Sequence, residues 1–462
     1  MDKIFKHLRI NAMSASVAAI ICGLGGHAIA QSIYAPQVQG IGPTDLFQDV
    51  VNGVPSAGNS YISGANLAGS LSNNGIGANW LIGGRADDNL WQRATTGASE
   101  TTTYAYGGPD RFAYWSGTST AMTVSDVTTA AALPIGSAHA FRMQRTASQT
   151  GVVQMCMAQE LTSINSYYLQ GHTVELDANV YTGANFSGTG LTAYVVYGTS
   201  TDEGMQKLSY GLNAGGGGSV GWTGQANATA AVIPLGAVST AYRIMAVASI
   251  PTTETEVGVA LCYTPVGTAG TTDALYFSNV ELRKADYLSN FVNSASAYTV
   301  TTNAQNASTA QITATINGIV QNAVIPAFSR RQDATEATLQ YSYFDLIAEA
   351  NTAGVVQGPA GSYDTTTTCT IAFPLPAPMW KVPTLIVTAI NAYNALSATT
   401  FKINPTTTPV VLASAFAALQ TGASTTTSGV VSFKTTTETQ YVMCELNSTA
   451  SGGGAFAFNA EE

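Results

Sequence analysis

The sequence has little charge. Asp, Glu, Lys and Arg make up only 10% of its 462 residues, against about 25% in an average soluble protein. The formal net charge is −10 with 17 basic residues, and after residue 9 the basic residues occur only singly or in pairs. Because nucleic-acid binding depends on basic patches that neutralise phosphates, we predict that the protein has no nucleic-acid partner.

Histidine is also scarce, with four residues in the chain. The histidines are too scattered to suggest a catalytic triad, and together with the cysteines they show no metal-ligand spacing. Adjacent acidic pairs occur at Asp87-Asp88, Asp202-Glu203 and Glu461-Glu462, and each is interpreted as a solvated loop. We therefore predict a protein that is not an enzyme, with no catalytic residues, no metal and no cofactor.

The five cysteines are Cys22, Cys156, Cys262, Cys369 and Cys444. With Cys22 set aside, two fall in each of two expected domains, so Cys156–Cys262 and Cys369–Cys444 are candidate disulfides. The alternative is that all four are buried free thiols, which pack as small hydrophobic side chains. Both readings stay open, because a sequence does not place Cα atoms within bridging range.

β-Strand patterns fill most of the chain. In the stretch 257–263, Val257, Val259, Leu261 and Tyr263 alternate with smaller residues, as expected of a strand with two different faces. Roughly ten such segments separated by turn residues lie between Trp80 and Leu282, a spacing typical of a two-sheet sandwich. The sequence predicts an all-β protein, with a jelly-roll β-sandwich followed by a second, smaller β-sandwich domain.

Residues 1–31 resemble a secretory signal. A basic start is followed by an apolar stretch at 16–24, and Ala28-Ile29-Ala30 forms a small-residue cleavage pattern before Gln31. The apolar stretch is too short for a transmembrane helix. Either this leader is removed, or it is retained as an arm that docks into a partner.

The segment between the two expected β domains carries Ile312, Ile316, Ile319 and Ala323. Their spacing fits about two heptads with isoleucine at the seam, a pattern that favours trimeric coiled coils. Gly318 and the many threonines weaken a helix, so an irregular strand or arm is the alternative.

Tryptophan and tyrosine are the most plausible binding residues, because their flat faces can stack on sugar rings. Trp222 lies in a glycine-rich turn and is the best candidate for an exposed ring. Trp115, Tyr114 and Trp91 are further candidates for glycan binding. The alternative for each ring is a place in the core or in an interface.

Several short motifs, taken together and in order, resemble the phage tail fibre and virion appendage proteins that contain a jelly roll like that of carbohydrate-binding modules. Residues 44–62 are similar to the N-terminal segments of such fibres, and 328–331 with 339–344 look like their junction with a tip domain. The motifs within the jelly roll are 89–93, 108–115, 169–174, 195–199, 221–224 and 263–282.

The resemblance implies a structural protein of a phage virion that attaches to a host-surface glycan. It implies a homotrimer that binds other virion proteins through its N-terminal segment. The leader instead favours a secreted or cell-surface bacterial protein that binds glycans. The expected domains are the leader or arm (1–31), a virion-anchoring segment (32–75), the jelly roll (76–285), a linker (286–346) and a C-terminal tip domain (347–462).

Overall fold

The computed structural model describes the jelly-roll region almost completely and the rest of the chain in shorter pieces. The described residues are 46–48, 50–51, 54–55, 61–63, 79–93, 98–100, 104–106, 108–116, 122–128, 137–212, 221–289, 298–300, 311–316, 319–324, 328, 333–348, 354–355, 361–365, 368–386, 394–395, 401–403, 410–411, 428–434, 443–444, 446–448 and 454–461.

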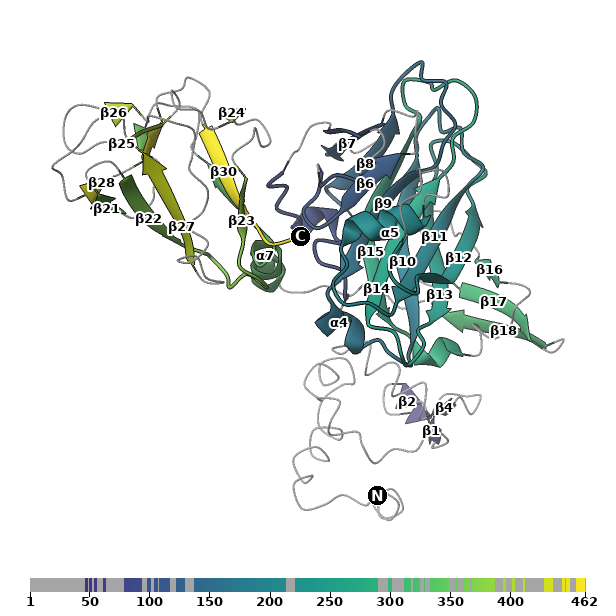
Figure 1. The fold of residues 1–462 in the computed structure, drawn as a ribbon. Helices are drawn as coiled ribbons and strands as arrows, with labels where there is room; N and C mark the ends of the chain where they lie inside the picture. Colours follow the sequence, from purple (N-terminus) through teal and green to yellow (C-terminus); the bar gives the residue numbers. More distant parts are fainter. Residues whose placement is uncertain are drawn as a thin grey trace, which may run out of the picture.

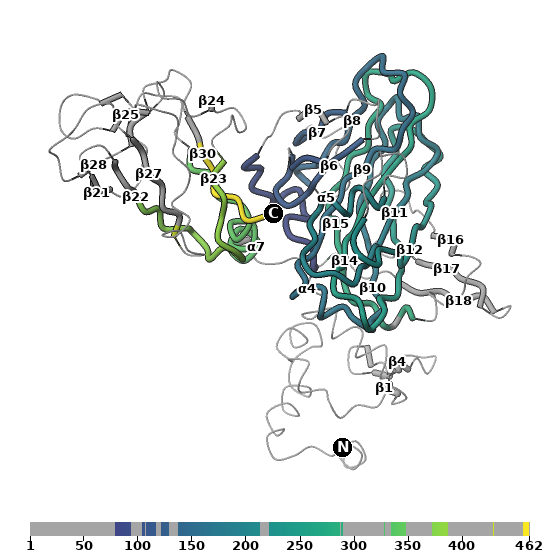
Figure 2. The backbone as a smooth tube through the Cα atoms, viewed as in Figure 1, coloured from purple at the N-terminus to yellow at the C-terminus, as the bar shows by residue number. Residues whose placement is uncertain are grey.

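The main domain is a β-sandwich of two antiparallel sheets (Figure 1). One sheet has the order β13-β10-β15-β8-β7-β5 and the other β12-β11-β14-β9-β6. The strands are β5 (Ala98–Glu100), β6 (Ala113–Ser116), β7 (Met122–Val127), β8 (Ala140–Arg145), β9 (Met155–Leu161), β10 (Thr173–Thr182), β11 (Gly190–Gly198), β12 (Ala226–Pro234), β13 (Ala241–Ser249), β14 (Glu256–Tyr263) and β15 (Ala274–Lys284). From β8 onward the chain passes repeatedly between the sheets, which lie face to face (Figure 2). The prediction of an all-β fold with a jelly-roll sandwich is confirmed.

Strand β14 has two buried faces, and the alternation in its sequence assigns each face to a different core. Val257, Val259, Leu261 and Tyr263 belong to the apolar core between the sheets. The small residues of the other face pack in a second apolar cluster on the outside of the five-stranded sheet. At Gly258 an added Cβ would lie 2.8 Å from the Trp222 ring and 2.9 Å from the Leu208 side chain. Small residues are therefore needed on this face of the strand.

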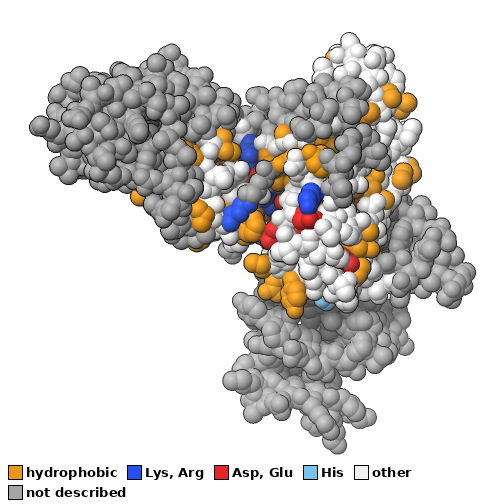
Figure 3. Space-filling view, viewed as in Figure 1, with side chains coloured by type: hydrophobic (Ala, Val, Ile, Leu, Met, Phe, Trp, Pro, Cys, Tyr) orange, Lys and Arg blue, Asp and Glu red, His pale blue; other side chains and the backbone are white. Residues whose placement is uncertain are grey.

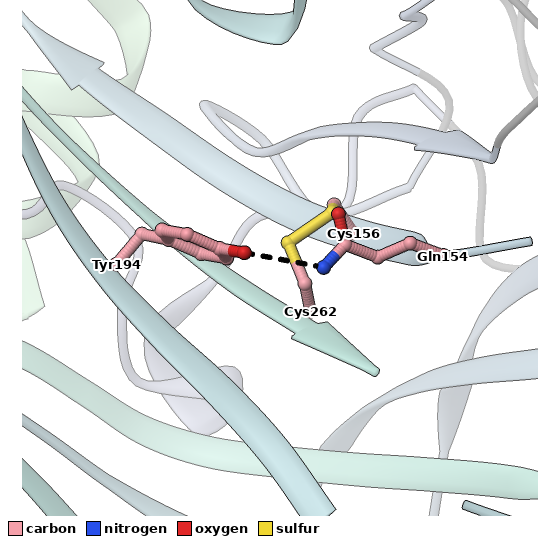
Figure 4. The surroundings of a disulfide bond; sticks show 4 residues. All are labelled: Gln154, Cys156, Tyr194 and Cys262. Atoms are coloured by element: carbon pink, nitrogen blue, oxygen red, sulfur yellow. Dashed lines mark hydrogen bonds between the residues drawn. A yellow bond between two sulfur atoms is a disulfide. The ribbon is translucent and has the colours of Figure 1, made fainter. Parts of the chain in front are cut away.

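The disulfide between Cys156 and Cys262 lies within this outer cluster (Figure 4). The two cysteines are direct partners on the neighbouring strands β9 and β14, and their Cα atoms are 4.1 Å apart. Beside them, the Gln154 side-chain amide donates a hydrogen bond of 3.3 Å to the Tyr194 hydroxyl. Of the two readings that the sequence left open for this pair, the structure has the disulfide.

Cys369 and Cys444 lie on β22 (Thr368–Pro374) and β28 (Met443–Cys444), and each of these strands pairs with β21 (Gly361–Thr365). The two cysteines therefore lie on strands that flank a third strand rather than on direct neighbours. Their pairing stays a prediction.

Short helices accompany the sheets, although the sequence of the main domain suggested none. They are α4 (Ser163–Tyr167), α5 (Met205–Leu212) and the 3-10 turns η3 (Ala86–Asp88) and η5 (Asp286–Leu288). Helix α5 covers the outside of the five-stranded sheet with Met205, Leu208 and Leu212 (Figure 1). A third helix, α7 (Asp333–Tyr341), follows the linker.

The coiled-coil interpretation of the linker is wrong. Ile312, Ile316, Ile319 and Ala323 lie in a hairpin of β17 (Gln311–Ile316) and β18 (Ile319–Val324), with β16 (Tyr298–Val300) alongside β17. Ile316 pairs with Ile319, so two residues, Asn317 and Gly318, separate the paired ends. Asn-Gly is the strongest short hairpin signal, and it outweighs a heptad pattern among β-branched residues that are poor helix formers.

The described N-terminal residues form two small strand pairs. Strand β1 (Leu46–Gln48) pairs with β4 (Tyr61–Ser63), and β2 (Val50–Val51) pairs with β3 (Val54–Pro55). Val51 of β2 pairs with Val54 of β3, so the sequence Asn52-Gly53, which is typical of tight hairpin turns, separates the two strands. The predicted signal or arm at residues 1–31 lies outside the described residues.

The C-terminal region is also built of β-strands. Its sheets are β19-β30-β23 with β24 beside β30, β20-β29-β25-β26, and β27-β22-β21-β28. The remaining bounds are β19 (Phe344–Ala348), β20 (Gly354–Val355), β23 (Thr384–Ile386), β24 (Asn394–Ala395), β25 (Phe401–Ile403), β26 (Val410–Val411), β27 (Ser428–Lys434), β29 (Leu446–Ser448) and β30 (Gly454–Asn459). A second, smaller sandwich at 347–462 stays a prediction.

The cross-strand disulfide is expected to stabilise the jelly roll. Replacing both partners in the C156A/C262A variant should lower the free energy of unfolding by about 2–4 kcal/mol, because the bridge closes a long loop in the unfolded chain. Denaturant titration of both proteins without reductant measures this loss. Peptide mapping under non-reducing conditions supplies the control, and failure to recover a linked Cys156–Cys262 peptide would contradict the assignment.

Candidate functional site

The four aromatic residues predicted to bind glycan are buried. Trp222 is 2% exposed, Trp115 2%, Tyr114 0% and Trp91 6%. The prediction that Trp222 presents an exposed ring is therefore wrong. None of the four offers a face to a ligand in this structure.

Their burial follows from where each ring packs. Trp222 lies beside α5, and its indole Nε1 donates a hydrogen bond of 2.9 Å to the carbonyl of Gly204. Trp115 packs in the same outer cluster. Tyr114 and Trp91 belong to the core between the sheets, where the Trp91 ring lies 5.5 Å from the ring of Phe141. The alternative reading, that these rings are core residues, is the one the structure supports.

A cleft with a cavity of about 190 Å³ lies where the jelly roll meets the C-terminal strands. Acidic and basic side chains gather between the two parts in Figure 3. The cleft is lined from the jelly roll by Tyr104, Arg111, Glu160, Leu161, Thr162, residues 202–206 and Glu256, and from the C-terminal part by Tyr343, Trp380, Lys381 and Glu461. Residues far apart in the sequence thus form one concave and strongly polar surface.

Two arginines of the jelly roll hold the C-terminal part in place at the cleft. The Arg93 guanidinium forms an ion pair with Glu461 and lies 3.8 Å from the centre of the Phe344 ring. The Arg111 guanidinium lies 3.7 Å from the centre of the Tyr343 ring, and its Nη1 is 3.6 Å from Oε1 of Glu461. Because these groups are largely desolvated, each cation–π contact contributes up to about 2 kcal/mol.

Glutamine side chains of each part also form hydrogen bonds with backbone groups of the other part. Gln340 on α7 accepts a hydrogen bond of 2.8 Å from the Leu90 N–H through its Oε1. Its Nε2 donates one of 2.8 Å to the carbonyl of Asp88. Gln92 donates one of 3.0 Å from Nε2 to the carbonyl of Phe344. These bonds hold residues 88–92 and residues 340–344 in a fixed alignment where the two segments border the cleft.

Arg111 has a backbone conformation that side chains rarely adopt. Its φ is 70°, in the left-handed region that costs a non-glycine residue roughly 1–2 kcal/mol. Its side chain is 2% exposed, and Nη2 donates a hydrogen bond of 3.1 Å to the carbonyl of Glu160. This conformation directs the guanidinium against Tyr343 and into the wall of the cleft.

The carboxyl groups of the cleft have very different environments. Burial raises the pKa of Glu160 to about 8, so this side chain is largely neutral at pH 7. Burial also raises the pKa of Glu256. Glu203 is the opposite case, since its bond to Lys207 lowers its pKa to about 2. The cleft therefore combines a protonated carboxyl group, which can donate a hydrogen bond, with an ionised carboxylate, which accepts one.

An exposed aromatic surface borders the cleft at α4, and we name it the tyrosine shelf. It has a cavity of about 370 Å³ lined by Ser163, Ile164, Tyr167, Tyr168, Gln170, Thr201 and Thr255. Ile164, Tyr167 and Tyr168 are 69%, 66% and 54% exposed. Hydrophobic side chains are visible at this end of the jelly roll in Figure 3. The Trp80 ring stacks on Tyr168 at 5.8 Å.

The cleft and the shelf are neighbours. Thr162 lines the cleft and Ser163 the shelf, and Asp202 lines the cleft and Thr201 the shelf. At the border, the Ser163 N–H and hydroxyl donate hydrogen bonds of 2.8 and 3.0 Å to the Asp202 carboxylate. The two cavities therefore adjoin at these residues.

The acidic pairs interpreted as solvated loops include residues of this site. Asp202 and Glu203 do lie in a loop, but they line the cleft. Glu461 is 3% exposed and paired with arginine, so its reading as a solvated residue is wrong. Its partners lie more than 300 residues earlier in the chain, and no local sequence signal reveals them.

Two features are absent from the described residues. No helix there is sufficiently long and apolar to cross a membrane. No group of three or more His, Cys, Asp or Glu side chains in the same part of the chain is arranged to hold a metal ion.

Comparison with known proteins found likenesses only among solved structures. No family model matches the chain, and no curated protein matches it. It is similar to the enzymatically active domain of tailspike protein 4 of bacteriophage CBA120, at 10% identity and a TM-score of 0.25, over 45% of this chain and 21% of that one. It therefore spans about a fifth of that tailspike domain.

Carbohydrate-binding modules of the β-sandwich superfamily are also similar. One matches at 10% identity and a TM-score of 0.27, over 40% of this chain and 63% of its own. The C-terminal family 22 module of Clostridium thermocellum Xyn10B matches at 12% identity and a TM-score of 0.23, over 43% of this chain and 96% of its own. Because the sequence identities and TM-scores of these matches are so low, any assignment of function depends on the site itself.

The protonation of Glu160 is testable through stability. Its pKa is about 8 in the folded protein against an ordinary value of 4.5, so between these pH values the folded state binds a proton that the unfolded state does not. Glu160 therefore makes stability fall as pH rises through this window. In E160Q the free energy of unfolding should fall less steeply with pH.

Denaturant titrations at several pH values measure this slope. E254Q is the matched control, because it changes a buried carboxyl group outside the cleft that has no ion pair or histidine partner among the described residues. Parallel curves for the wild type and E160Q would show that Glu160 has an ordinary pKa.

Proposed function

We propose that the protein binds a glycan without cleaving it, along the cleft and the tyrosine shelf. The observation that carries this proposal is the continuity of the two surfaces across Thr162, Ser163, Thr201 and Asp202. A polar cleft suits the hydroxyl groups of a sugar, and an exposed aromatic surface suits its apolar face.

The cleft offers a complete set of partners for a sugar ring. Carboxylates accept hydrogen bonds from hydroxyl groups, and the guanidinium of Arg111 and the ammonium of Lys381 donate them. Trp380 lines the same cavity and is only partly buried, so its side chain can contact a sugar in the cleft. At about 190 Å³ the cavity is smaller than the roughly 300–1,000 Å³ typical of small-molecule pockets. It therefore suits one end of a chain that continues onto the shelf.

We place this activity on a phage virion, in a tail fibre or appendage that attaches to a host-surface glycan. In this proposal the protein is a homotrimer, and residues 32–75 bind other virion proteins. Support comes from the ordered motifs that resemble such fibres and from a composition low in charge. Of those motifs, 89–93, 108–115 and 339–344 include the residues that join the two parts of the chain at the cleft.

A secreted or cell-surface bacterial glycan-binding protein is the second candidate. The signal-like leader at residues 1–31 favours it. Both candidates use the same binding site and differ in location.

Aromatic truncation should weaken glycan binding. Tyr167→Ala and Trp380→Ala should each lower affinity by about tenfold, because a stacked ring contributes roughly 1–1.5 kcal/mol. A glycan array identifies a ligand, and calorimetry compares the variants on it. Val232→Ala is the control, since this side chain is 72% exposed on β12, away from both surfaces. Unchanged affinity in both aromatic variants would remove the cleft and the shelf from the binding site.

The location is tested on particles. If the protein is a virion component, mass spectrometry of purified phage should detect peptides from both the jelly roll and the C-terminal region. Its absence from particles, together with its recovery from the culture medium or cell surface of a bacterium, would favour the second candidate.

A further inference from the structure

The charges in the cleft do not balance. Five carboxyl groups line it, from Glu160, Asp202, Glu203, Glu256 and Glu461, against the cationic groups of Arg111 and Lys381. A lining of this composition favours a ligand that brings positive charge, because opposite charges across a desolvated contact are attractive and like charges are costly.

Local ion pairs remove part of the imbalance. Glu203 is 2.5 Å from Nζ of Lys207. Glu461 is paired with Arg93 and with Arg111. These two carboxylates already have cationic partners, so they are not the groups that require a charged ligand.

Three acidic side chains remain without a cation at ion-pair distance within the described part of the chain. Asp202 receives hydrogen bonds from Ser163. Glu256 is 2% exposed and receives its bonds from the Ser200 hydroxyl and the Glu203 N–H. Glu160 has neither an ion pair nor a side-chain hydrogen bond to another described residue.

Lys381 acts on Glu160 and Asp202 only through longer-range attraction. Its Nζ lies 5.0 Å from the centre of the Trp380 ring, and it makes no ion pair with a carboxylate among the described residues. Arg111 and Lys381 compensate a charge on Glu160 only in part, and burial keeps this carboxyl group largely neutral at pH 7 in the free protein. An incoming ammonium group would supply the missing partner, and the carboxyl group would then lose its proton.

Unsatisfied atoms in the wall of the cleft indicate independently that a ligand belongs there. Oε1 of Glu461 and Nε of Arg111 are buried and have no hydrogen-bond partner, although an ion pair of 3.6 Å joins the two side chains. Both residues are more than nine-tenths buried and line the cavity. Such atoms are rare in native proteins, since a buried polar atom without a hydrogen bond costs roughly 1–3 kcal/mol. Both atoms are closed to solvent, so a hydroxyl group in the cleft can bond to them only after a small shift of these side chains.

We propose that the cleft is specific for a saccharide with a free amino group, and that an unacetylated amino sugar binds with its ammonium group against Glu160 and Glu256. The proposal rests on the glycan binding proposed above and names the class of sugar. The same carboxylates disfavour a uronic or other acidic sugar, whose charge would face theirs. The tyrosine shelf contacts the uncharged face of the next sugar in the saccharide.

Calorimetry on the full-length protein tests the proposal. The probes are a glucosamine tetramer, the N-acetylglucosamine tetramer of equal length, a uronic acid tetramer and tetralysine, all at about 150 mM salt, where exposed charges are largely screened. The glucosamine tetramer should bind at least tenfold more tightly than the acetylated one, because a hydrogen bond to a charged group contributes about 1.5–3 kcal/mol.

Two variants separate a specific site from general attraction to an acidic protein. E160Q cannot ionise, so the affinity ratio between the amino and acetylated tetramers should fall towards one. D126N removes a carboxylate outside the cleft and should leave the ratio unchanged. A preserved ratio in E160Q, or equal binding of tetralysine, would overturn the proposal.

The outcomes also separate this inference from the proposed function. Equal or tighter binding of the acetylated or the uronic acid tetramer would overturn only the preference for an amino sugar. Absence of binding to all three saccharides and to every member of a glycan array would overturn glycan binding as well.

Discussion

Buried peptide groups need hydrogen-bond partners, and in residues 79–93 side chains supply many of them because this segment lies outside both sheets. Ile82 exchanges hydrogen bonds of 2.7 and 2.8 Å with the Gln159 amide on β9. Farther along, Leu90 and Asp88 bond to Gln340 on α7. The segment is thus tied on one side to the jelly roll and on the other to the C-terminal part. The cleft exists because this arrangement brings the two parts together.

The same joint explains the electrostatics of the cleft. Glu160 follows Gln159 directly, so the strand that satisfies the buried segment also carries a carboxyl group into the contact region. Arg111 reaches Tyr343 and Glu461 only through a left-handed backbone conformation. Strain of this kind often persists at functional sites, where surrounding contacts over-determine it. Here the buried arginine, the neutral glutamic acid and the unsatisfied atoms all occur within one cavity.

The strands of the jelly roll could be predicted from the sequence because alternation along a strand reports directly on burial. Val257 to Tyr263 shows this well, since its large and small faces meet different cores. The linker was less clear, because Ile312 and Ile316 fit a heptad as well as a strand. Asn317-Gly318 was the better guide, since it encodes a two-residue turn.

The site could not be predicted in the same way. Trp222 lies in a glycine-rich turn that suggested exposure, yet it packs against Gly258 on a strand more than thirty residues away. Tyr167 is the last residue of a single short helix and Tyr168 is its C-cap, and no periodic pattern sets them apart. Glu461 meets Arg93 and Arg111 only after the whole chain has folded. Tertiary contacts of this length leave no trace in local sequence.

The most direct test of the central claim, that one continuous surface formed by the cleft and the tyrosine shelf binds a glycan, is an experimental structure of the full chain with its best-binding oligosaccharide. The account predicts that the sugar lies with one end beside Glu160 and Trp380 and continues past Asp202 onto Tyr167. A sugar bound only on the distant C-terminal sheets, with the cleft empty, would contradict it.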